Sequence, residues 1–349
     1  MSSSKADNRR NVILTHTVES DDWEFRRGIS KYSTLDFEVE SMSTGNGDSK
    51  LRNIMCYFLF PFIVFLKRNQ YNFIVANQQF YGLILAFYCR LFHVRKSFKM
   101  VVIAYIYKPK NGWIGWIYQK FMQYIATSDY IDKYVVRSSR ELETYPQLLG
   151  IDPSRLVFIP LGLGGNFDAP IDEAMQQRKY VLSVGRSNRN YPFLIDALED
   201  VTDYNVEIIC DTLNLEPRNP RIRVHKDIHA ELPLWMKNCY CVVIPLLDKE
   251  TSSGQLVLLQ AMMEGKPVII TRSNAILDYF IPSEMGFAIE NTKEELLQAL
   301  KTLYTDTELY QQFSLREKEL FQERFSAERD VEAIGKLIKS LIEKSENDI

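Results

Sequence analysis

The sequence predicts an α/β protein built from two doubly wound domains. Apolar runs of strand length alternate with helix-like stretches along the chain, as in parallel α/β folds. A length of 349 residues exceeds a usual single core, and a hydrophobic content of 46% is enough to fill two. The stretch RLVFIPLGLGGNFDAPIDEA, with its glycines and prolines, marks a linker near the middle. We therefore expect a first domain over 1–162, a linker over 163–178 and a second domain over 179–326.

The first domain is predicted to contain a parallel sheet. It opens with NVILTH at 11–16 and continues with FIVA at 73–76, MVVIAYIY at 100–107 and KYVVRSS at 133–139. These runs are rich in β-branched and aromatic residues, which favour strands. A helix-like apolar stretch that begins at Tyr81 lies between the second and third runs.

The second domain repeats this pattern with the runs KYVLSV, VEIIC, RIRVH, CYCVVIP and PVIIT. Continuous apolar runs are typical of parallel strands that are buried on both faces. A final helix is predicted over 327–345. Its apolar residues are spaced to bury one face, and they are Val331, Ile334, Leu337, Ile338 and Leu341.

The segment TSSGQLVLLQAMMEGKPVIIT, residues 251–271, predicts a loop, a short helix, a glycine stop and a buried strand. Ser252 and Ser253 can cap this helix. Its first turn would present backbone N–H groups at positive potential, which favours binding of a phosphate. These amides belong to Gly254, Gln255 and Leu256. Gln260 lies roughly 10 Å further along the same face, a reach suited to a ribose. The alternative is an ordinary αβ unit whose apolar residues simply pack on a sheet.

A second phosphate-compatible element follows the strand predicted over 180–184. Its loop, GRSNRNYP, contains Arg186 and Arg189, whose guanidinium groups can clamp a diphosphate. Asn190 can cap the next helix, and Pro192 suits its first turn. Arginines beside a strand end are more often solvated surface than ligands. Two such elements in one half of the chain nevertheless favour a nucleotide site.

These two segments resemble the nucleotide-sugar site of family 4 retaining glycosyltransferases. The positions that fit the family's motifs are Gly185-Arg186, Ala261-Met262, Gly265 and Pro267-Val268. Arg189 looks like a displaced substitute for the family's lysine. The resemblance covers about residues 100–325. It implies the GT-B fold, in which two Rossmann-like doubly wound domains face a cleft and the last helix returns to the first domain.

The chain departs from that family where two glutamates normally contact the donor sugar and the ribose. Ser252 and Gln260 occupy these positions here. Gln260 can still offer one donor and one acceptor to a ribose diol, without the charge that strengthens such hydrogen bonds. Glu250 is a candidate for the missing sugar contact. The predicted sugar and ribose contacts are therefore Glu250, Ser252, Ser253 and Gln260.

The resemblance implies transfer of a hexosyl group from a nucleotide diphosphate sugar to a hydroxyl held by the first domain. Arg186, Arg189 and the amides at the helix start would stabilise the leaving diphosphate, the electrostatic task that is usually worth most. Family precedent favours front-face transfer with retention, without a protein nucleophile and without a metal or other cofactor. Candidate walls for the nucleoside base stand at two strand ends, and they are Asp211, Thr212, Asp227 and Ile228.

Charge is distributed unevenly between the two halves of the chain. Residues 1–160 hold 21 Lys and Arg against 14 Asp and Glu, which leaves 21 against 31 for the remainder. The basic half also contains the apolar runs Ile54–Leu66 and Tyr81–Phe92, each followed by basic residues. The first run is too short to span a membrane. Two interpretations remain open, a helix of the core or a face that rests on an anionic membrane.

Acceptor contacts are expected at strand ends of the first domain, where open α/β sheets place ligands. His16 ends the first strand and is the candidate catalytic residue, while Lys108 and Lys110 follow the run at 100–107. Ordinary surface is the alternative for all three. Basic residues beside an apolar face would suit a lipid-diphosphate acceptor. Bacterial surface-polysaccharide assembly is therefore the natural hypothesis.

Other classes of function are disfavoured. The chain is slightly acidic and shows no nucleic-acid-binding module, and its five cysteines and four histidines lack metal-ligand spacing. No secretory pattern opens the sequence, so we expect a cytoplasmic protein, with peripheral attachment to the inner face of the membrane left open. Two rivals to the transferase remain, a GT-B nucleotide-sugar epimerase and a non-catalytic GT-B scaffold or partner subunit.

Overall fold

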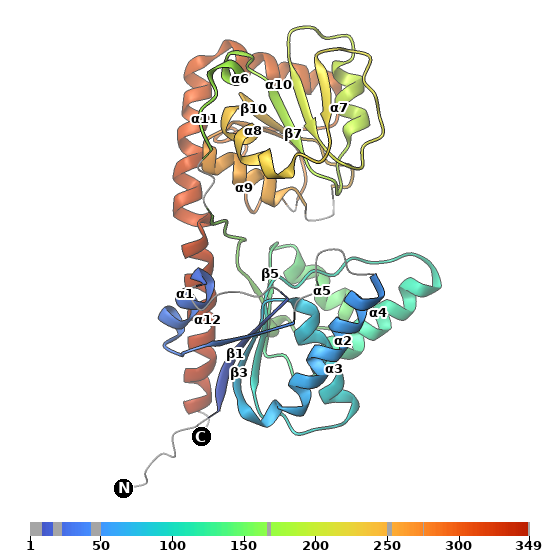
Figure 1. The fold of residues 1–349 in the computed structure, drawn as a ribbon, viewed down its shortest axis with the longest axis vertical. Coiled ribbons are helices and arrows are strands. Elements are labelled where there is room, and N and C mark those ends of the chain that lie inside the picture. The colour runs from blue at the N-terminus through green and yellow to red at the C-terminus, as the bar shows by residue number, and fades with distance from the viewer. Residues whose placement is uncertain are drawn as a thin grey trace. The chain divides into compact units, whose positions relative to one another are not determined.

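The computed structural model describes residues 9–16, 23–42, 50–165, 169–249, 253–274 and 276–347. The chain divides into two compact units (Figure 1). Unit 1 consists of Met1–Ile159 together with Asp330–Ile349, and unit 2 consists of Pro160–Arg329. Unit 1 is therefore discontinuous in sequence, because the chain leaves it after Ile159 and returns to it at Asp330.

Unit 1 contains a parallel sheet. Its strands are β1 (Arg10–Thr15), β2 (Glu38–Ser41), β3 (Tyr71–Ala76), β4 (Lys99–Val102), β5 (Lys133–Val136) and β6 (Leu156–Phe158). In the described residues they form one six-stranded sheet in the order β2-β1-β3-β4-β5-β6, and each neighbouring pair is parallel. Leu14 of β1 pairs with Glu40 on one side and Ala76 on the other.

Helices cover both faces of this sheet. They are α1 (Glu24–Ser33), α2 (Lys50–Leu66), α3 (Gln79–Leu91), α4 (Gly112–Ala126), α5 (Glu141–Leu149) and α12 (Ala327–Asn347). Short 3₁₀ turns at Arg68–Gln70 and Pro153–Arg155 precede β3 and β6. Figure 1 shows α2, α3 and α4 together on one side of the strands, and α1 and α12 on the other.

Unit 1 has one core on each face, because successive residues of a strand point in opposite directions. Val12 and Leu14 of β1 pack in the core that contains residues of α2, α3, α4 and α5. Ile13 packs in the other core with residues of α1 and α12. The contributions of α12 are Val331, Ile334, Ile338 and Leu341. Just before them, Asp330 forms a 2.7 Å ion pair with Arg137, and both side chains are nearly buried.

The strands of unit 1 follow the predicted runs with one clear exception. The run at 100–107 was expected to be a strand throughout, but β4 ends at Val102. Ala104 has a backbone φ of 55°, a conformation that an L-residue in a strand does not adopt. The chain therefore turns out of the sheet soon after β4, and Lys108 does not lie at a strand end. The short strand β2 was not predicted.

Unit 2 contains the second parallel sheet. Its strands are β7 (Val181–Val184), β8 (Val206–Ile209), β9 (Ile222–His225), β10 (Cys241–Ile244), β11 (Val268–Thr271) and β12 (Gly286–Ile289). The described residues give the order β12-β11-β10-β7-β8-β9, again with parallel neighbours. β7, β8, β10 and β11 are buried at every position. The five runs predicted for this half are thereby confirmed as strands.

Helices also flank the second sheet. They are α6 (Glu173–Gln177), α7 (Tyr191–Leu198), α8 (Leu232–Asn238), α9 (Gln255–Glu264), α10 (Lys293–Thr305) and α11 (Thr307–Leu320), with single turns of other helix types at His229–Glu231 and Phe321–Phe325. One core contains residues of α8 and α9, and the other contains residues of α7 and α10. The predicted fold class, two doubly wound parallel sheets, is therefore confirmed. α6 lies inside the stretch that was expected to be a linker.

Candidate functional site

The topology of unit 2 identifies one edge of its sheet as a place for a ligand. β7 and β10 are neighbours, and the chain proceeds from β7 to β8 and β9 on one side and from β10 to β11 and β12 on the other. The connections after β7 and β10 therefore diverge to opposite sides. In open α/β sheets, ligands bind outside the carboxyl ends of the strands at such a point.

The two loops at this point are the two phosphate-compatible segments of the sequence. One loop follows β7 and leads into α7, and the other follows β10 and leads into α9. The N–H of Asn190 donates to the carbonyl of Pro245 at 2.8 Å, and Arg189 forms an isolated antiparallel bridge with Leu246. Residues that lie about 55 positions apart in the sequence are thus brought into direct contact.

Asn188 links these loops a second time through its side chain. Its Nδ2 donates to the carbonyl of Asp248 at 2.8 Å and to Oγ of Ser253 at 2.7 Å. Its Oδ1 accepts from the N–H of Asp248 at 2.7 Å. The backbone φ of Asn188 is 57°, in the left-handed region that Asn tolerates better than most residues. Sequence reasoning gave Asn188 no role, although an Asn in a turn after a strand is a signal for such a conformation.

The start of α9 differs from the prediction in its capping. Ser253 was expected to cap the helix, but the N-cap is Gly254, which makes no side-chain capping bond. Gly254 has a φ of 92°, and a Cβ at this position would lie 3.3 Å from Cγ2 of Ile244. Glycine is therefore needed here. Ser253 instead accepts a hydrogen bond from Asn188.

The first turn of α9 lies next to the loop that follows β7. The first helical hydrogen bond runs from the N–H of Leu258 to the carbonyl of Gly254, and Gln255 and Leu256 occupy the turn between them. The side chain of Leu256 is 52% exposed, so this turn is at the surface of unit 2. The helix dipole adds positive potential there. An anion would be stabilised at this end of α9.

The two predicted arginines occupy different environments. Arg186 is exposed, so its guanidinium is available to a ligand. Arg189 turns inward, where its Nε donates to the carbonyl of Val184 at 2.9 Å and its Nη1 donates to that of Ser187 at 3.0 Å. Burial lowers the pKa of the Arg189 guanidinium. Arg189 thus stabilises the loop through its hydrogen bonds to two carbonyls. Arg186 is the better placed of the two arginines to bind a diphosphate.

Comparison with known proteins begins with the family model described as Glycosyl transferases group 1, which matches residues 178–306. The matched range includes both loops and α9. HepE from Anabaena in complex with UDP-glucose is 16% identical, covers 96% of this chain and 99% of its own, and has a TM-score of 0.67. Sucrose-phosphate synthase from Thermosynechococcus elongatus is 15% identical, with coverages of 96% and 100% and a TM-score of 0.71.

A third solved structure, a glycosyltransferase from Rickettsia africae, is 13% identical over 95% of this chain and 99% of its own, with a TM-score of 0.66. The chain has the GT-B fold. At identities this low, likeness to the solved structures establishes the fold alone, while the family match supports a glycosyltransferase. A search of curated proteins found no match.

Within this GT-B fold, Gln260 lies deeper than the predicted ribose contact would require. Its side chain is only 6% exposed, and its Oε1 has no hydrogen-bond partner among the described residues. A buried acceptor without a donor costs about 1–3 kcal/mol. Gln260 is therefore a polar group that a nearby donor would stabilise. The other predicted sugar contacts, Glu250 and Ser252, lie outside the described residues.

The residues predicted to line the base pocket are partly brought together. The N–H of Asp227 donates to Oδ1 of Asp211 at 3.0 Å, which joins the ends of β8 and β9. The Oγ1 of Thr212 lies 3.5 Å from Sγ of Cys210 on the same turn. Ile228, in contrast, packs against the core. Asp211 and Asp227 can thus stand on one wall.

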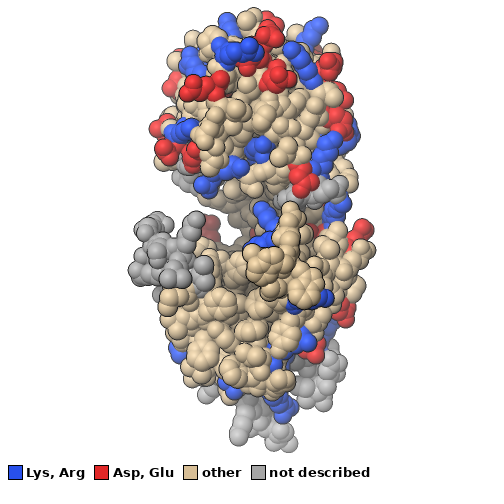
Figure 2. Space-filling view, turned by 90° about the vertical axis from the view of Figure 1, so that its right-hand side faces the viewer, with Lys and Arg blue, Asp and Glu red and all other residues tan. Residues whose placement is uncertain are grey.

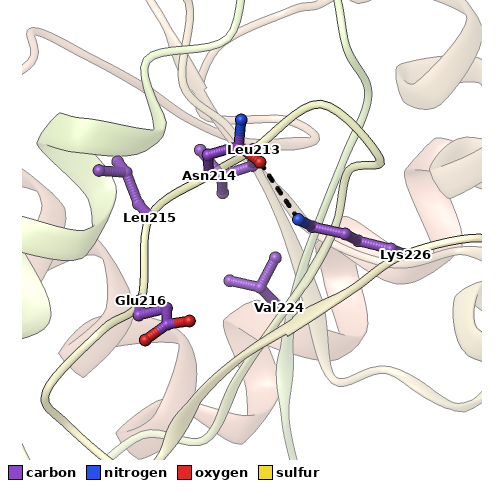
Figure 3. Close-up of a pocket in the computed structure, with 6 residues that line it drawn as sticks. All are labelled: Leu213, Asn214, Leu215, Glu216, Val224 and Lys226. Carbon is purple, nitrogen blue, oxygen red and sulfur yellow. Dashed lines mark hydrogen bonds between the residues drawn. The ribbon is translucent and has the colours of Figure 1, made fainter.

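A cavity of about 510 Å³ lies near these residues, but none of them lines it (Figure 3). Its lining comes from the chain after β8 and from β9 and the residue that follows it, namely Leu213, Asn214, Leu215, Glu216, Val224 and Lys226. Nζ of Lys226 donates to Oδ1 of Asn214 at 3.3 Å. Since β9 is the last strand of the sheet order, this cavity belongs to the sheet margin and is separate from the site at β7 and β10.

The predicted acceptor residues of unit 1 fall in two places. His16 is exposed directly after β1, whose neighbours are β2 and β3. Lys108 and Lys110 are also exposed and line a groove of about 700 Å³ between α2, α3 and α4. Nζ of Lys110 lies 4.5 Å from the ring centroid of Tyr118. His16 is not among the residues that line this groove.

The groove is otherwise mostly apolar. Its lining side chains, apart from the two lysines, are Tyr57, Phe58, Gln79, Phe80, Ile84, Ile106, Tyr118, Phe121 and Met122. Oε1 of Gln79 accepts a hydrogen bond from the N–H of Ile106 at 2.9 Å, which fixes one end of the wall. An apolar groove with cations at its rim can hold an apolar chain that ends in an anion.

No group of three or more His, Cys, Asp and Glu in the described part of the chain could hold a metal ion. The five cysteines are free, and Cys89, Cys210, Cys239 and Cys241 are buried. Burial raises the pKa of the Cys89 thiol to about 12, so this group is neutral at physiological pH.

Proposed function

We propose that the protein is a glycosyltransferase that moves a hexosyl group from a nucleotide diphosphate sugar to an acceptor hydroxyl. The observation that carries this proposal is the set of hydrogen bonds that joins the two loops after β7 and β10 in unit 2. Asn188 holds the loop of Arg186 beside the start of α9. A guanidinium and a helix N-terminus are thereby offered to one ligand, and both favour phosphate.

The comparisons support this donor class. The family match covers the two loops and α9, and HepE, a structure with the same fold, was solved with UDP and with UDP-glucose. Arg186 and the amides of the first turn of α9 would stabilise the charge that develops on the leaving nucleoside diphosphate. The unpartnered Oε1 of Gln260 would accept a hydrogen bond from a ribose hydroxyl of the donor. Glu250 remains our candidate for the donor sugar.

For the acceptor we propose a lipid-linked glycan that bears a diphosphate. The groove of unit 1 would hold the lipid, and Lys108 and Lys110 at its rim would neutralise the diphosphate. His16, at the end of β1, is the proposed acceptor-side catalytic residue. By family resemblance, transfer retains the anomeric configuration and needs no metal. The reaction would belong to the assembly of a cell-surface glycan on the cytoplasmic face of the membrane.

Donor binding is tested by calorimetry of the purified protein with UDP, GDP, ADP and CMP and with their sugar conjugates. We expect one diphosphate to bind selectively and Arg186→Ala to abolish the signal. Arg218→Ala is the matched control, since Arg218 is an exposed arginine of the same unit with 86% of its side chain accessible. Absence of binding across the panel contradicts the proposal.

Two further outcomes separate the rival functions. The replacement of both family glutamates, by Ser252 and Gln260, is the feature that favours a non-catalytic scaffold. Selective nucleotide binding without transfer or hydrolysis, on any lipid-linked acceptor, would support that scaffold. An epimerase would convert or release the sugar in the absence of an acceptor. Transfer that depends on acceptor supports the proposed activity against both.

A further inference from the structure

α4 exposes a stripe of large apolar side chains. Trp113, Trp116 and Ile117 are 74%, 62% and 50% exposed. Trp113 and Ile117 lie four residues apart, so they share one side of the helix with the exposed Lys120. On the opposite side, Met122, Ile125 and Ala126 are anchored in the core of unit 1. The stripe is therefore held rigidly in an outward direction.

α2 exposes a second apolar stripe on the same side of the sheet. Met55, Leu59 and Leu66 are 60%, 50% and 63% exposed, while Phe60 and Val64 of the same helix are buried in the core. One side of the run Ile54–Leu66 is thus a core helix, and its other side is exposed. The groove of unit 1 lies between the two stripes, because residues of α2 and α4 form its walls.

We refer to α2, α4 and the groove between them as the apolar face. Figure 2 looks at the side of unit 1 that carries α2, α3 and α4 and shows a broad area in which charged side chains are few. Solvent-exposed apolar areas of this kind usually mark an interaction surface. In the described residues, no helix is both long and apolar enough to cross a membrane.

The helices of the apolar face and the segments that connect them carry charge of a single sign. From Lys50 to Ser128 the sequence contains eleven Lys and Arg and no Asp or Glu. Lys67, Lys108, Lys110 and Lys120 are exposed within this range. Unit 2 shows no such bias, since the remainder after residue 160 is acidic. The partner of the apolar face is therefore expected to be both apolar and anionic.

We propose that the apolar face docks on the surface of an anionic lipid bilayer, with the rings of Trp113 and Trp116 at the level of the headgroups. Tryptophan prefers that level because its ring is apolar and its N–H is polar. Lysines at the margin reach phosphate headgroups while their methylene stems cover apolar area. A second copy of this chain fits less well, because a symmetric contact would place cations against cations.

The docking concerns unit 1 alone and does not depend on the proposed sugar transfer. It would place the open groove against the lipid, so that an acceptor with an apolar chain could enter without crossing water. Failure of docking would leave the donor site of unit 2 untouched. Failure of donor binding would likewise leave the docking surface unchanged. The two proposals are therefore tested separately.

The first test is cosedimentation of the full chain with vesicles of phosphatidylcholine, alone or mixed with phosphatidylglycerol. We expect binding to the anionic mixture and little to the neutral lipid. The double variant Trp113→Ser, Trp116→Ser should reduce partitioning about tenfold or more, because it removes two large exposed apolar rings from the face that inserts. The matched control is Leu315→Ser, which removes a 62% exposed leucine from unit 2.

A charge variant provides the second arm. Lys120→Glu should lower partitioning on anionic vesicles by at least about fivefold, the effect of losing one cation near such a surface. Lys301→Glu, an exposed lysine of unit 2, should have no comparable effect. Binding that is equal on neutral and anionic vesicles overturns the proposal. So does a dimer in solution that the double tryptophan variant abolishes, since the face would then be occupied by a second copy.

Fluorescence distinguishes insertion from loss of folding. The chain has four tryptophans, Trp23, Trp113, Trp116 and Trp235. Vesicles that carry brominated acyl chains should quench the wild-type emission. The conservative variant Trp113→Phe, Trp116→Phe should still bind vesicles and should lose that quenching. Quenching that persists in this variant would show that another part of the chain contacts the lipid and would overturn the assignment.

Discussion

The two units contain the same kind of sheet and differ at the edge where such sheets bind ligands. In unit 2, hydrogen bonds from Asn188 join the loops that follow β7 and β10. In unit 1, His16 is exposed directly after β1, and Lys108 and Lys110 line an apolar groove between α2, α3 and α4. One edge is fixed by internal contacts, and the other is open to its surroundings.

This contrast agrees with the position of the family match, which lies in unit 2 alone. The family match covers residues 178–306, entirely within unit 2. A diphosphate requires the same few groups in every enzyme that binds it, so its site retains a pattern. An acceptor site has to fit one particular molecule. Under the proposed function, unit 2 supplies the common chemistry and unit 1 supplies the specificity.

The largest expected effect is on the affinity for the donor nucleotide, which should depend on unit 2 and not on unit 1. Arg186→Ala should weaken binding of the preferred nucleoside diphosphate by roughly 100-fold, because each charge-assisted hydrogen bond contributes about 1.5–3 kcal/mol. Lys108→Ala in unit 1 should leave this affinity unchanged. Calorimetry measures both variants. A comparable loss in the two would show that the donor is not confined to unit 2.

The next effect tests whether the edge of unit 2 is fixed by Asn188. Asn188→Ala removes its hydrogen bonds to Asp248 and Ser253, so the free energy of unfolding should fall by about 2 kcal/mol. Donor affinity should fall as well, since the two loops are no longer held together. Urea unfolding and calorimetry provide the measurements. Asn214→Ala, at an exposed asparagine of the same unit, is the control, and equal effects would remove the special role of Asn188.

A third effect should appear only in unit 1. Charge reversal of Lys108 and Lys110 to glutamate should lower turnover on a lipid-linked acceptor by about tenfold or more, given roughly 1 kcal/mol for each cation near an anion-rich lipid surface. Donor affinity should stay as in the wild type. The measurement is transfer of labelled sugar at saturating donor. Normal turnover in this variant would exclude the pair from the acceptor site.

The smallest effect compares one buried carboxyl in each unit. In unit 1, Glu141 accepts hydrogen bonds from the N–H groups of Arg137 and Ser138 and from the hydroxyl of Tyr145. In unit 2, Glu317 is completely buried, and neither of its oxygens has a partner among the described residues. Burial raises the pKa of Glu317 well above its ordinary value of 4.5. The folded state therefore holds this proton more tightly than the unfolded chain does.

Stability should accordingly fall as pH rises from 4.5 through the folded pKa of Glu317. Glu317→Gln cannot ionise, so it should raise the free energy of unfolding by about 1 kcal/mol or more at pH 8 and change it little at pH 4. Glu141→Gln should instead destabilise the protein, because an acceptor is lost. Thermal unfolding at both pH values gives the comparison. A Glu317 variant without pH dependence would contradict this account.

The sequence predicts most of the apolar strands and misses the polar strand β2. The strands β8 and β10 are predicted by the apolar runs VEIIC and CYCVVIP, because parallel strands that are buried on both faces need such runs. β2 reads EVES and lies at a sheet edge, where no apolar pattern is required. The run at 100–107 looks like one strand because its apolar character continues after β4 ends. Its end depends on the backbone of Ala104, which side-chain hydrophobicity does not report.

The candidate site was predictable in position but only partly in its contacts. Arg186 and the start of α9 follow from local patterns. Asn188 does not, because its role depends on partners 60 and 65 residues further along the chain. Arg189 looked equivalent to Arg186 as a cation, yet two nearby carbonyls bind its guanidinium. Contacts between distant segments decide these roles, and a single sequence does not contain them explicitly.

The discontinuity of unit 1 has a consequence for how the chain is made. Unit 2 is encoded without interruption by Pro160–Arg329, whereas unit 1 lacks its last segment until residues beyond Asp330 have emerged. Until then, Ile13, Phe73 and Val135 lack the cover that α12 provides. During synthesis, the unit that comes second in the sequence can therefore complete its core first. In the amino-terminal half, α1 alone covers that face of the sheet until α12 has been made.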